Sequence, residues 1–187
     1  MALGRWFSRK EGPEAAAAAL YVTVVEQARR PDFYIQAAVP DSIDGRFELI
    51  ALHTFLVLHR LAPDAEASDL SQALFDRFFA DMDRSLREMG VGDMGIGKRI
   101  QHMAQSFYGR MSVYREALAG DDAGLEAALR RNLYGTVPAT EAPPVAAVAA
   151  YVRAVVADLA SQPAQGLMAG KARFPEPPSI PASGQPA

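Results

Sequence analysis

Apolar residues recur every three or four positions in six segments of the chain, and no segment alternates apolar and polar residues as an amphipathic strand would. This spacing gathers the apolar side chains on one face of a helix. We therefore expect an all-α fold, a single helical bundle of about six helices. The expected helices cover residues 13–28, 44–61, 68–86, 96–118, 122–133 and 145–159.

Residues suited to helix ends flank these segments. Pro13 stands at the start of the first, where its missing N–H costs little. Ser42 or Asp44 can cap the second, and Asp121 or Asp122 the fifth. The apolar residues of segment 44–61 wrap most of the circumference, so we expect it to be the central buried helix.

The length of 187 residues, half of them hydrophobic, suits one domain with a core of its own. We place that domain at residues 13–161, after a flexible segment, 1–12, that carries basic and aromatic side chains. Six of the 13 prolines fall after Ser161, and no amphipathic face continues there. Residues 162–187 are therefore expected to form a disordered proline-rich tail.

Composition and motif spacing argue against several kinds of function. Cysteine is absent, which removes disulfides, thiolate catalysis and cysteine-bound metals. The net charge of −3 disfavours direct nucleic-acid binding. His53 and His59 are six residues apart and His102 is isolated, whereas paired ligands on a helix need a spacing of four. With no nucleophile motif either, we expect no enzyme activity, no metal and no cofactor.

The stretch GVGDMGIGKR, residues 90–99, matches two nucleotide-binding patterns. Both patterns require a strand before the glycines, but the preceding residues have helical spacing. Arg99 also stands where a phosphate loop needs the hydroxyl of Ser or Thr. The glycines are better explained as a turn in which Gly90 ends one helix and Asp93 caps the next. A nucleotide-dependent regulator using Gly92–Lys98 stays as an alternative.

The same turn is a candidate docking surface for a protein partner. Its glycines allow another backbone to approach closely, and basic residues stand beside them. Methionine side chains suit varied apolar partners. We hypothesise a client-binding site formed by Arg84, Arg87, Met89, Gly92, Met94, Gly95, Lys98 and Arg99.

The N-terminal stretch MALGRWFSRK combines aromatic and basic residues. On a helix, Trp6 and Phe7 would share a face, with basic side chains around the other side. Such a segment can touch an anionic membrane surface, so Trp6 and Phe7 are candidate membrane contacts. The alternative is an unstructured start. No run of 18 apolar residues exists to span a bilayer.

Three stretches together resemble the ubiquinol–cytochrome c chaperone family. They are FYIQAAVPDSIDGRFELIALHTFLVLHRL, LSQALFDRFFADMDRSLREMGVGDMGIGKRIQHMAQSFYGRM and, more weakly, ALRRNLYG. The resemblance implies an all-helical chaperone that binds newly made cytochrome b, without catalysis, during biogenesis of ubiquinol–cytochrome c reductase. It carries over neither the small partner protein nor the ribosome with which mitochondrial members work. A helical interaction protein with another membrane client is a further alternative.

A client chaperone of this kind needs an apolar groove with charged flanks. Because no long basic, acid-poor transit peptide is visible, we expect a cytoplasmic protein at the inner face of the bacterial membrane, rather than one of the mitochondrial matrix. In the motif DGRF, Asp44 and Gly45 suit a helix start and a close contact. Arg46 and Arg110 either pair with Asp81 or Asp83 in a buried network or face the client.

Overall fold

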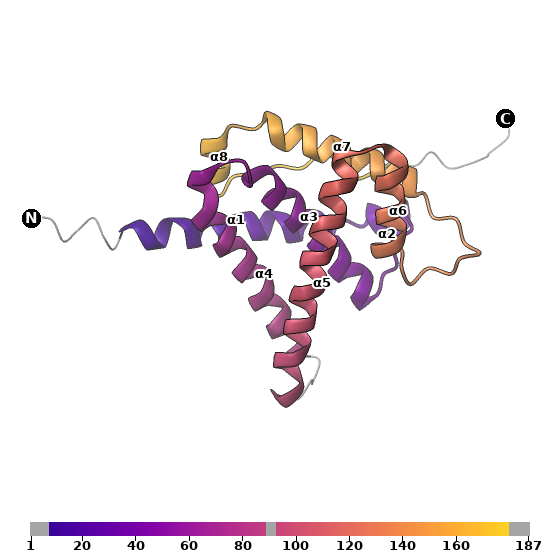
Figure 1. Ribbon diagram of the computed structural model, residues 1–187, viewed down its shortest axis with the longest axis horizontal. Coiled ribbons are helices and arrows are strands. Elements are labelled where there is room, and N and C mark those ends of the chain that lie inside the picture. The colour runs from indigo at the N-terminus through magenta and orange to yellow at the C-terminus, as the bar shows by residue number, and fades with distance from the viewer. Residues whose placement is uncertain (1–7, 89–92, 180–187) are drawn as a thin grey trace, which may run out of the picture.

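The computed structural model describes residues 8–88 and 93–179. Within these ranges, it describes the side chains of residues 12–85, 87–88 and 104–179. The described ranges contain helices and no strand, which confirms the all-α expectation (Figure 1). The helices are α1 (Ser8–Ala28), α2 (Asp32–Ile35), α3 (Ile43–Leu61), the short 3-10 helix η1 (Ala65–Ala67), α4 (Ser68–Glu88), α5 (Asp93–Ala119), α6 (Asp122–Asn132), α7 (Val145–Ser161) and α8 (Ala164–Met168).

Helix α3 is the centre of the domain. Every residue from 48 to 58 is buried, because α1, α4, α5 and α7 all pack against it. The expectation of a central helix is therefore confirmed. A helix that is apolar around its whole circumference must be covered on all sides, and the other helices are arranged to do this.

The start of α3 depends on a cap and a close backbone contact. The Ser42 hydroxyl accepts a hydrogen bond from the Gly45 N–H at 3.1 Å, so Ser42 is the cap and Asp44 lies in the first turn. A Cβ atom on Gly45 would stand only 2.0 Å from the Pro40 carbonyl oxygen. Glycine is required at this position for space, as the sequence suggested.

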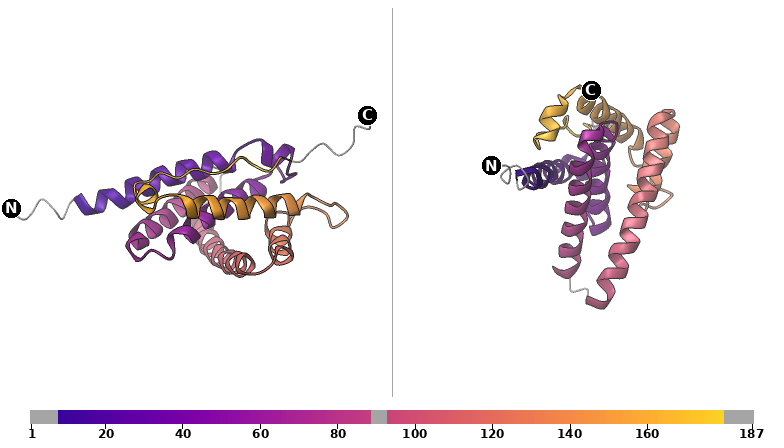
Figure 2. Two further views of the ribbon diagram at one scale, coloured as in Figure 1. Left: turned by 90° about the horizontal axis from the view of Figure 1, so that it is seen from above. Right: turned by 60° about the vertical axis from the view of Figure 1, so that its left-hand side comes forward.

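Helices α4 and α5 form a hairpin, which we call the arm. Figures 1 and 2 show the arm extending from the body, its two helices approaching each other at the end remote from the other helices. Aromatic rings fill the seam: Phe75 lies 4.6 Å from Phe79 and 5.9 Å from Phe107, measured between ring centroids. Phe78 joins this cluster to α3 by stacking on Phe47 at 5.9 Å. Aromatic packing therefore connects the arm to the core.

Helix boundaries differ from the expectation in several places. α1 begins at Ser8, five residues before the expected start, and contains Pro13 within it. α5 begins at Asp93, three residues before the expected start. The short helices α2, η1 and α8 were not expected, since three to five residues are too few to show a period. Residues 1–7 lie outside the described chain.

The expectation of a disordered tail from residue 162 is wrong as far as residue 179. After Ser161 the chain forms α8, whose Leu167 is fully buried, and then an extended segment, residues 169–179, which we call the strap. Figure 2 shows the strap running between α1 and α7. At Gly170 the φ angle is +78°, and an added Cβ would lie 2.9 Å from the Ala16 Cα atom. Residues 180–187 lie outside the described chain.

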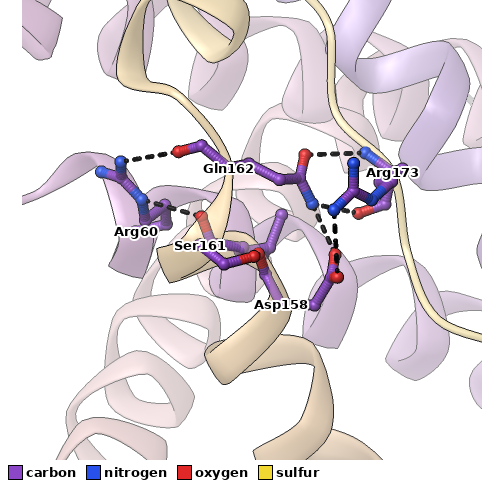
Figure 3. A network of polar contacts seen from close by, with 6 residues as sticks. Arg60, Asp158, Ser161, Gln162 and Arg173 are labelled. Atoms are coloured by element: carbon purple, nitrogen blue, oxygen red, sulfur yellow. Dashed lines mark hydrogen bonds and ion pairs between the residues drawn. The ribbon is translucent and has the colours of Figure 1, made fainter.

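Amide side chains fasten the strap (Figure 3). Gln162 donates to the Arg173 carbonyl at 2.8 Å and accepts from the Arg173 N–H at 3.1 Å. On α1, Gln27 donates to the Pro175 carbonyl at 2.9 Å. Arg60 secures the end of α7 by donating to the Leu159 carbonyl at 3.0 Å. The strap is thus ordered by partners on other elements, which no pattern in its own residues predicts.

Candidate functional site

The expected docking residues that belong to α4 lie at the far end of the arm. Arg84 and Arg87, near the end of α4, have side chains 58% and 53% exposed. Arg84 pairs with the carboxylate of Asp81 at 2.9 Å, and Arg87 with that of Asp83 at 2.8 Å. These exposed pairs leave both guanidinium groups facing solvent, where they contribute little to stability.

The rest of the expected site lies at the start of α5 or outside the described residues. Met94, Gly95, Lys98 and Arg99 belong to the first two turns of α5, and their side chains are outside the described set. Met89, Gly92, Trp6 and Phe7 lie outside the described residues altogether. The docking and membrane-contact hypotheses therefore stay predictions.

The glycine-rich stretch has a different structural context from a phosphate loop. The chain before it is the helix α4, which ends at Glu88, and residues 93–99 of the stretch already form the first turns of α5. Phosphate loops and dinucleotide folds place a β-strand before the glycines. The nucleotide alternative thus lacks the strand on which its geometry depends.

A groove of about 370 Å³ lies between α5 and α7, with α3 at its base. Its walls are mostly apolar: Leu118 and Ala119 come from α5, and Val156, Ala157 and Ala160 from α7. The alanines are exposed and carry no side chain beyond Cβ. The groove is therefore a shallow apolar surface, open to solvent, bounded by two helices.

Three charged or polar side chains complete the lining of this groove: His59 at its base, and Arg115 and Arg153 at its edge. Arg153 donates to the Leu118 carbonyl at 3.4 Å and the Gly120 carbonyl at 3.1 Å, at the end of α5. It also pairs with Asp122 in the first turn of α6. Arg153 therefore satisfies carbonyl groups that α5 leaves open and holds α7 beside it.

Arg115 differs from Arg153, because within the described chain it makes no hydrogen bond or ion pair. Its guanidinium acts on His59, whose pKa is lowered by burial and by the positive charge of Arg115. The His59 ring is consequently neutral near pH 7. The edge of the groove thus presents one cation whose charge is not neutralised by a described carboxylate.

A buried ion pair lies where the arm joins the body. Arg110 of α5 donates to the Glu48 carboxylate of α3 at 2.6 Å, and its guanidinium lies 5.7 Å from the centre of the Phe47 ring. Burial raises the pKa of Glu48 to about 7, although the positive charge of Arg110 acts in the opposite direction. The pair is structural and links α3 to α5.

Of the two alternatives that the sequence left open for Arg46 and Arg110, pairing with Asp81 or Asp83 does not occur. Arg46 pairs instead with Asp41 at 2.6 Å on the surface. Asp81 accepts from the Tyr21 hydroxyl at 2.9 Å and from Arg84. Spacing along the chain could not reveal Glu48 as the partner of Arg110, because these two residues meet only when α5 folds back over α3.

His53 is fully occupied inside the core. Its Nδ1 lies 2.8 Å from the Leu49 carbonyl, so this nitrogen carries the proton and Nε2 accepts from the Tyr151 hydroxyl, also at 2.8 Å. Gln27 donates in turn to Tyr151. Burial lowers the pKa of His53 to about 4, so the ring is neutral. Both nitrogens have partners, which makes His53 a structural residue.

The described residues contain neither a candidate metal site nor a membrane-spanning helix. Among them, no group of three or more histidine, aspartate or glutamate side chains is arranged to hold a metal ion. Within the same ranges, no helix has both the length and the apolar character needed to cross a membrane.

Comparisons with known proteins identify similar chains. A family model described as "Ubiquinol-cytochrome C chaperone" matches residues 36–174. Ubiquinol-cytochrome c reductase complex assembly factor 1 of Mus musculus is 28% identical over 120 residues, which are 64% of this chain and 41% of that protein. Its counterpart in Xenopus laevis is 26% identical over 119 residues, which are 63% of this chain and 60% of that protein. The match thus spans less than two thirds of either relative.

A solved structure resembles the whole fold. The crystal structure of the Cbp3 homolog from Brucella abortus is 37% identical in sequence and superposes with a TM-score of 0.83. The superposition covers 94% of this chain and 97% of that one. The similarity therefore includes the arm and the groove-forming helices.

Proposed function

This chain belongs to the ubiquinol–cytochrome c chaperone family, and from that premise we propose that it binds newly made cytochrome b while ubiquinol–cytochrome c reductase is assembled. It acts by binding and not by catalysis. Its client is a membrane protein whose apolar helices are exposed to water until they insert or assemble, and covering such helices prevents their aggregation.

The groove between α5 and α7 is the observation that carries the proposal. It lies inside the matched range and combines an apolar wall, Leu118 and Val156, with the cation of Arg115 at its edge. A chaperone for apolar segments needs such a surface, because an apolar client helix loses contact with water there while the charged edge keeps the chaperone dissolved.

The far end of the arm is a second proposed contact with the client, through Arg84, Arg87, Lys98 and Arg99. Its basic residues suit the acidic or phosphate-bearing groups that accompany a nascent membrane protein. We further propose that the chain works at the inner face of a bacterial cytoplasmic membrane, with Trp6 and Phe7 touching the lipid.

Affinity capture with tagged protein from gently solubilised membranes of the native host tests the proposal. Freshly labelled cytochrome b is the analyte, and Lys98→Glu with Arg99→Glu is the comparator. Arg77→Glu, an exposed position on α4 away from the arm's end, is the single-site charge-reversal control. We expect the wild type and the control to capture cytochrome b.

Loss of capture in the double variant alone would support the arm as a contact. Capture retained by the double variant would support the proposed function but not the arm as a contact, and the groove would then be the proposed contact with the client. If the wild type captures other membrane proteins and no cytochrome b, the proposed client is wrong.

A further inference from the structure

We infer that the groove between α5 and α7 receives an apolar helix that carries a carboxylate, and that Arg115 pairs with that carboxylate. The assignment of this helix to the client rests on the proposed function. The chemistry of the bound segment rests on the groove itself.

The walls of the groove favour a helix as the occupant. Ala119, Ala157 and Ala160 are exposed and present only methyl groups. The distance between two packed helices depends on the side chains at their contact, so small residues let a third helix approach closely. The volume of about 370 Å³ suits a few side chains from one face of that helix, not a whole folded partner.

The edge of the groove favours a carboxylate on that helix. Arg115 has no ion pair within the described chain, whereas Arg153 is already bound to Asp122 and to the end of α5. A guanidinium forms paired hydrogen bonds with a carboxylate, which gives the contact a defined geometry as well as a favourable charge. His59 is neutral and does not compete for the anion. A single acidic residue on the apolar helix therefore meets a single free cation.

An acyl chain suits this groove less well. Sites for small amphiphiles bury most of the ligand, commonly in an enclosed cavity. Here the two alanine-bearing helices leave one side open to solvent. An open groove between helices is the geometry that receives an amphipathic helix.

Two designed peptides test the inference. Both are fluorescein-labelled helices of about 20 alanine and leucine residues, a length at which isolated helices form appreciably, and they differ only in one central Glu or Gln. Fluorescence anisotropy measures their binding to the full chain. Ala157→Leu fills the groove, and Ala154→Leu, exposed on α7 but outside the groove, is its matched control. Arg115→Gln removes the cation, with the exposed Arg77→Gln as control.

We expect the wild type to bind the Glu peptide about fivefold more tightly than the Gln peptide, the scale of a partly exposed charged hydrogen bond. Arg115→Gln should abolish this preference and leave binding of the Gln peptide unchanged. Ala157→Leu should weaken both peptides about tenfold or more. The two controls should match the wild type, and circular dichroism should show all variants folded.

The inference is wrong if Ala157→Leu and Ala154→Leu behave alike, if the Glu preference survives Arg115→Gln, or if the wild type binds neither peptide. It is also wrong if vesicles of phosphatidylglycerol and phosphatidylcholine bind in a manner that depends on Ala157 while the peptides do not, since the groove would then be a lipid site.

These results separate the inference from the proposed function. Capture of cytochrome b by a protein that ignores both peptides would refute only the inference. Groove-dependent peptide binding without capture of cytochrome b would support the inference and refute the proposed client.

Discussion

Helix α3 and the strap are ordered by opposite means. From residue 48 to 58 α3 is buried on all sides and contributes the apolar side chains that hold it in place. Within the strap, by contrast, only Gly170 and Pro177 are buried. The strap is held by Gln27 and Gln162, which hydrogen bond to its backbone from other elements, and by Phe174, which packs edge-on against His53 at 5.3 Å. A segment of the first kind reveals itself in its own sequence, whereas one of the second kind does not.

The largest expected effect comes from α3. Leu56 is 1% exposed, so Leu56→Ala leaves a cavity at the centre of the domain. We expect the free energy of unfolding to fall by about 2–5 kcal/mol. Urea denaturation at fixed pH measures this loss, with an unchanged m value as the control for two-state unfolding. A loss below about 1 kcal/mol would show that α3 is less central than its burial indicates.

A second variant, Glu48→Gln, tests whether α3 is stabilised by apolar packing alone. The pKa of Glu48 is raised to about 7 in the folded protein, so the folded state holds a proton that the unfolded state releases above pH 4.5. Its contribution to stability is therefore present at low pH and lost as the pH rises through 7. Between pH 5 and 8 the free energy of unfolding should fall by about 2–3 kcal/mol more in the wild type than in Glu48→Gln.

Urea denaturation of both proteins at the two pH values gives this double difference. The comparison cancels the opposite effect of His53, whose lowered pKa costs stability as the pH falls. Equal pH dependence in the two proteins would contradict the raised pKa of Glu48.

The strap should respond more locally. Gln162→Ala removes both hydrogen bonds to the Arg173 backbone and the one to Asp158. We expect a loss of about 1–3 kcal/mol, confined to the C-terminal segment. Hydrogen exchange should then speed up in residues 169–179 and stay unchanged in α3. Equal acceleration in both regions would mean that the strap and α3 unfold together, and the contrast between them would fail.

The smallest effect is expected at the outer edge of the strap. Arg30 pairs with Glu176 at 2.6 Å, but their side chains are 37% and 81% exposed. Solvent screens such a pair, so Arg30→Gln should leave the unfolding curve within experimental error. Thermal unfolding at low and high salt measures the difference. A clear, salt-sensitive loss would show that the strap depends on charge rather than on its amide contacts.

The sequence predicted those features that depend on neighbouring residues. Helical spacing located the six long helices, and Gly45 was correctly identified as a close contact. The partner of Arg110 was not predicted, because Glu48 is 62 residues away and meets it only in the folded chain. Similarly, the strap could not be predicted, since its prolines carry no periodic signal and its partners lie on α1 and at the end of α7.

The two candidate contact surfaces differ in the same way: one contains a sequence motif and the other does not. The glycine-rich stretch, residues 90–99, is conspicuous as a motif and was predicted as part of the docking surface. The groove has no motif: Arg115, Ala157 and Ala160 lie in ordinary helical sequence and come together only in the folded chain, where α5 and α7 line the same groove. A stripe of exposed alanines on α7 was the one available signal, and such stripes are common on helices that bind nothing.

Accumulation of cytochrome b in the native host tests the central claim most directly. The gene for this chaperone would be deleted and replaced by the wild type, by Ala157→Leu or by Ala154→Leu. Cytochrome b in the membranes would then be measured by reduced-minus-oxidised spectra. We predict that the deletion loses most cytochrome b, that the wild type and Ala154→Leu restore it, and that Ala157→Leu, although folded and present at equal abundance, does not. Normal cytochrome b in the deletion strain would contradict the account.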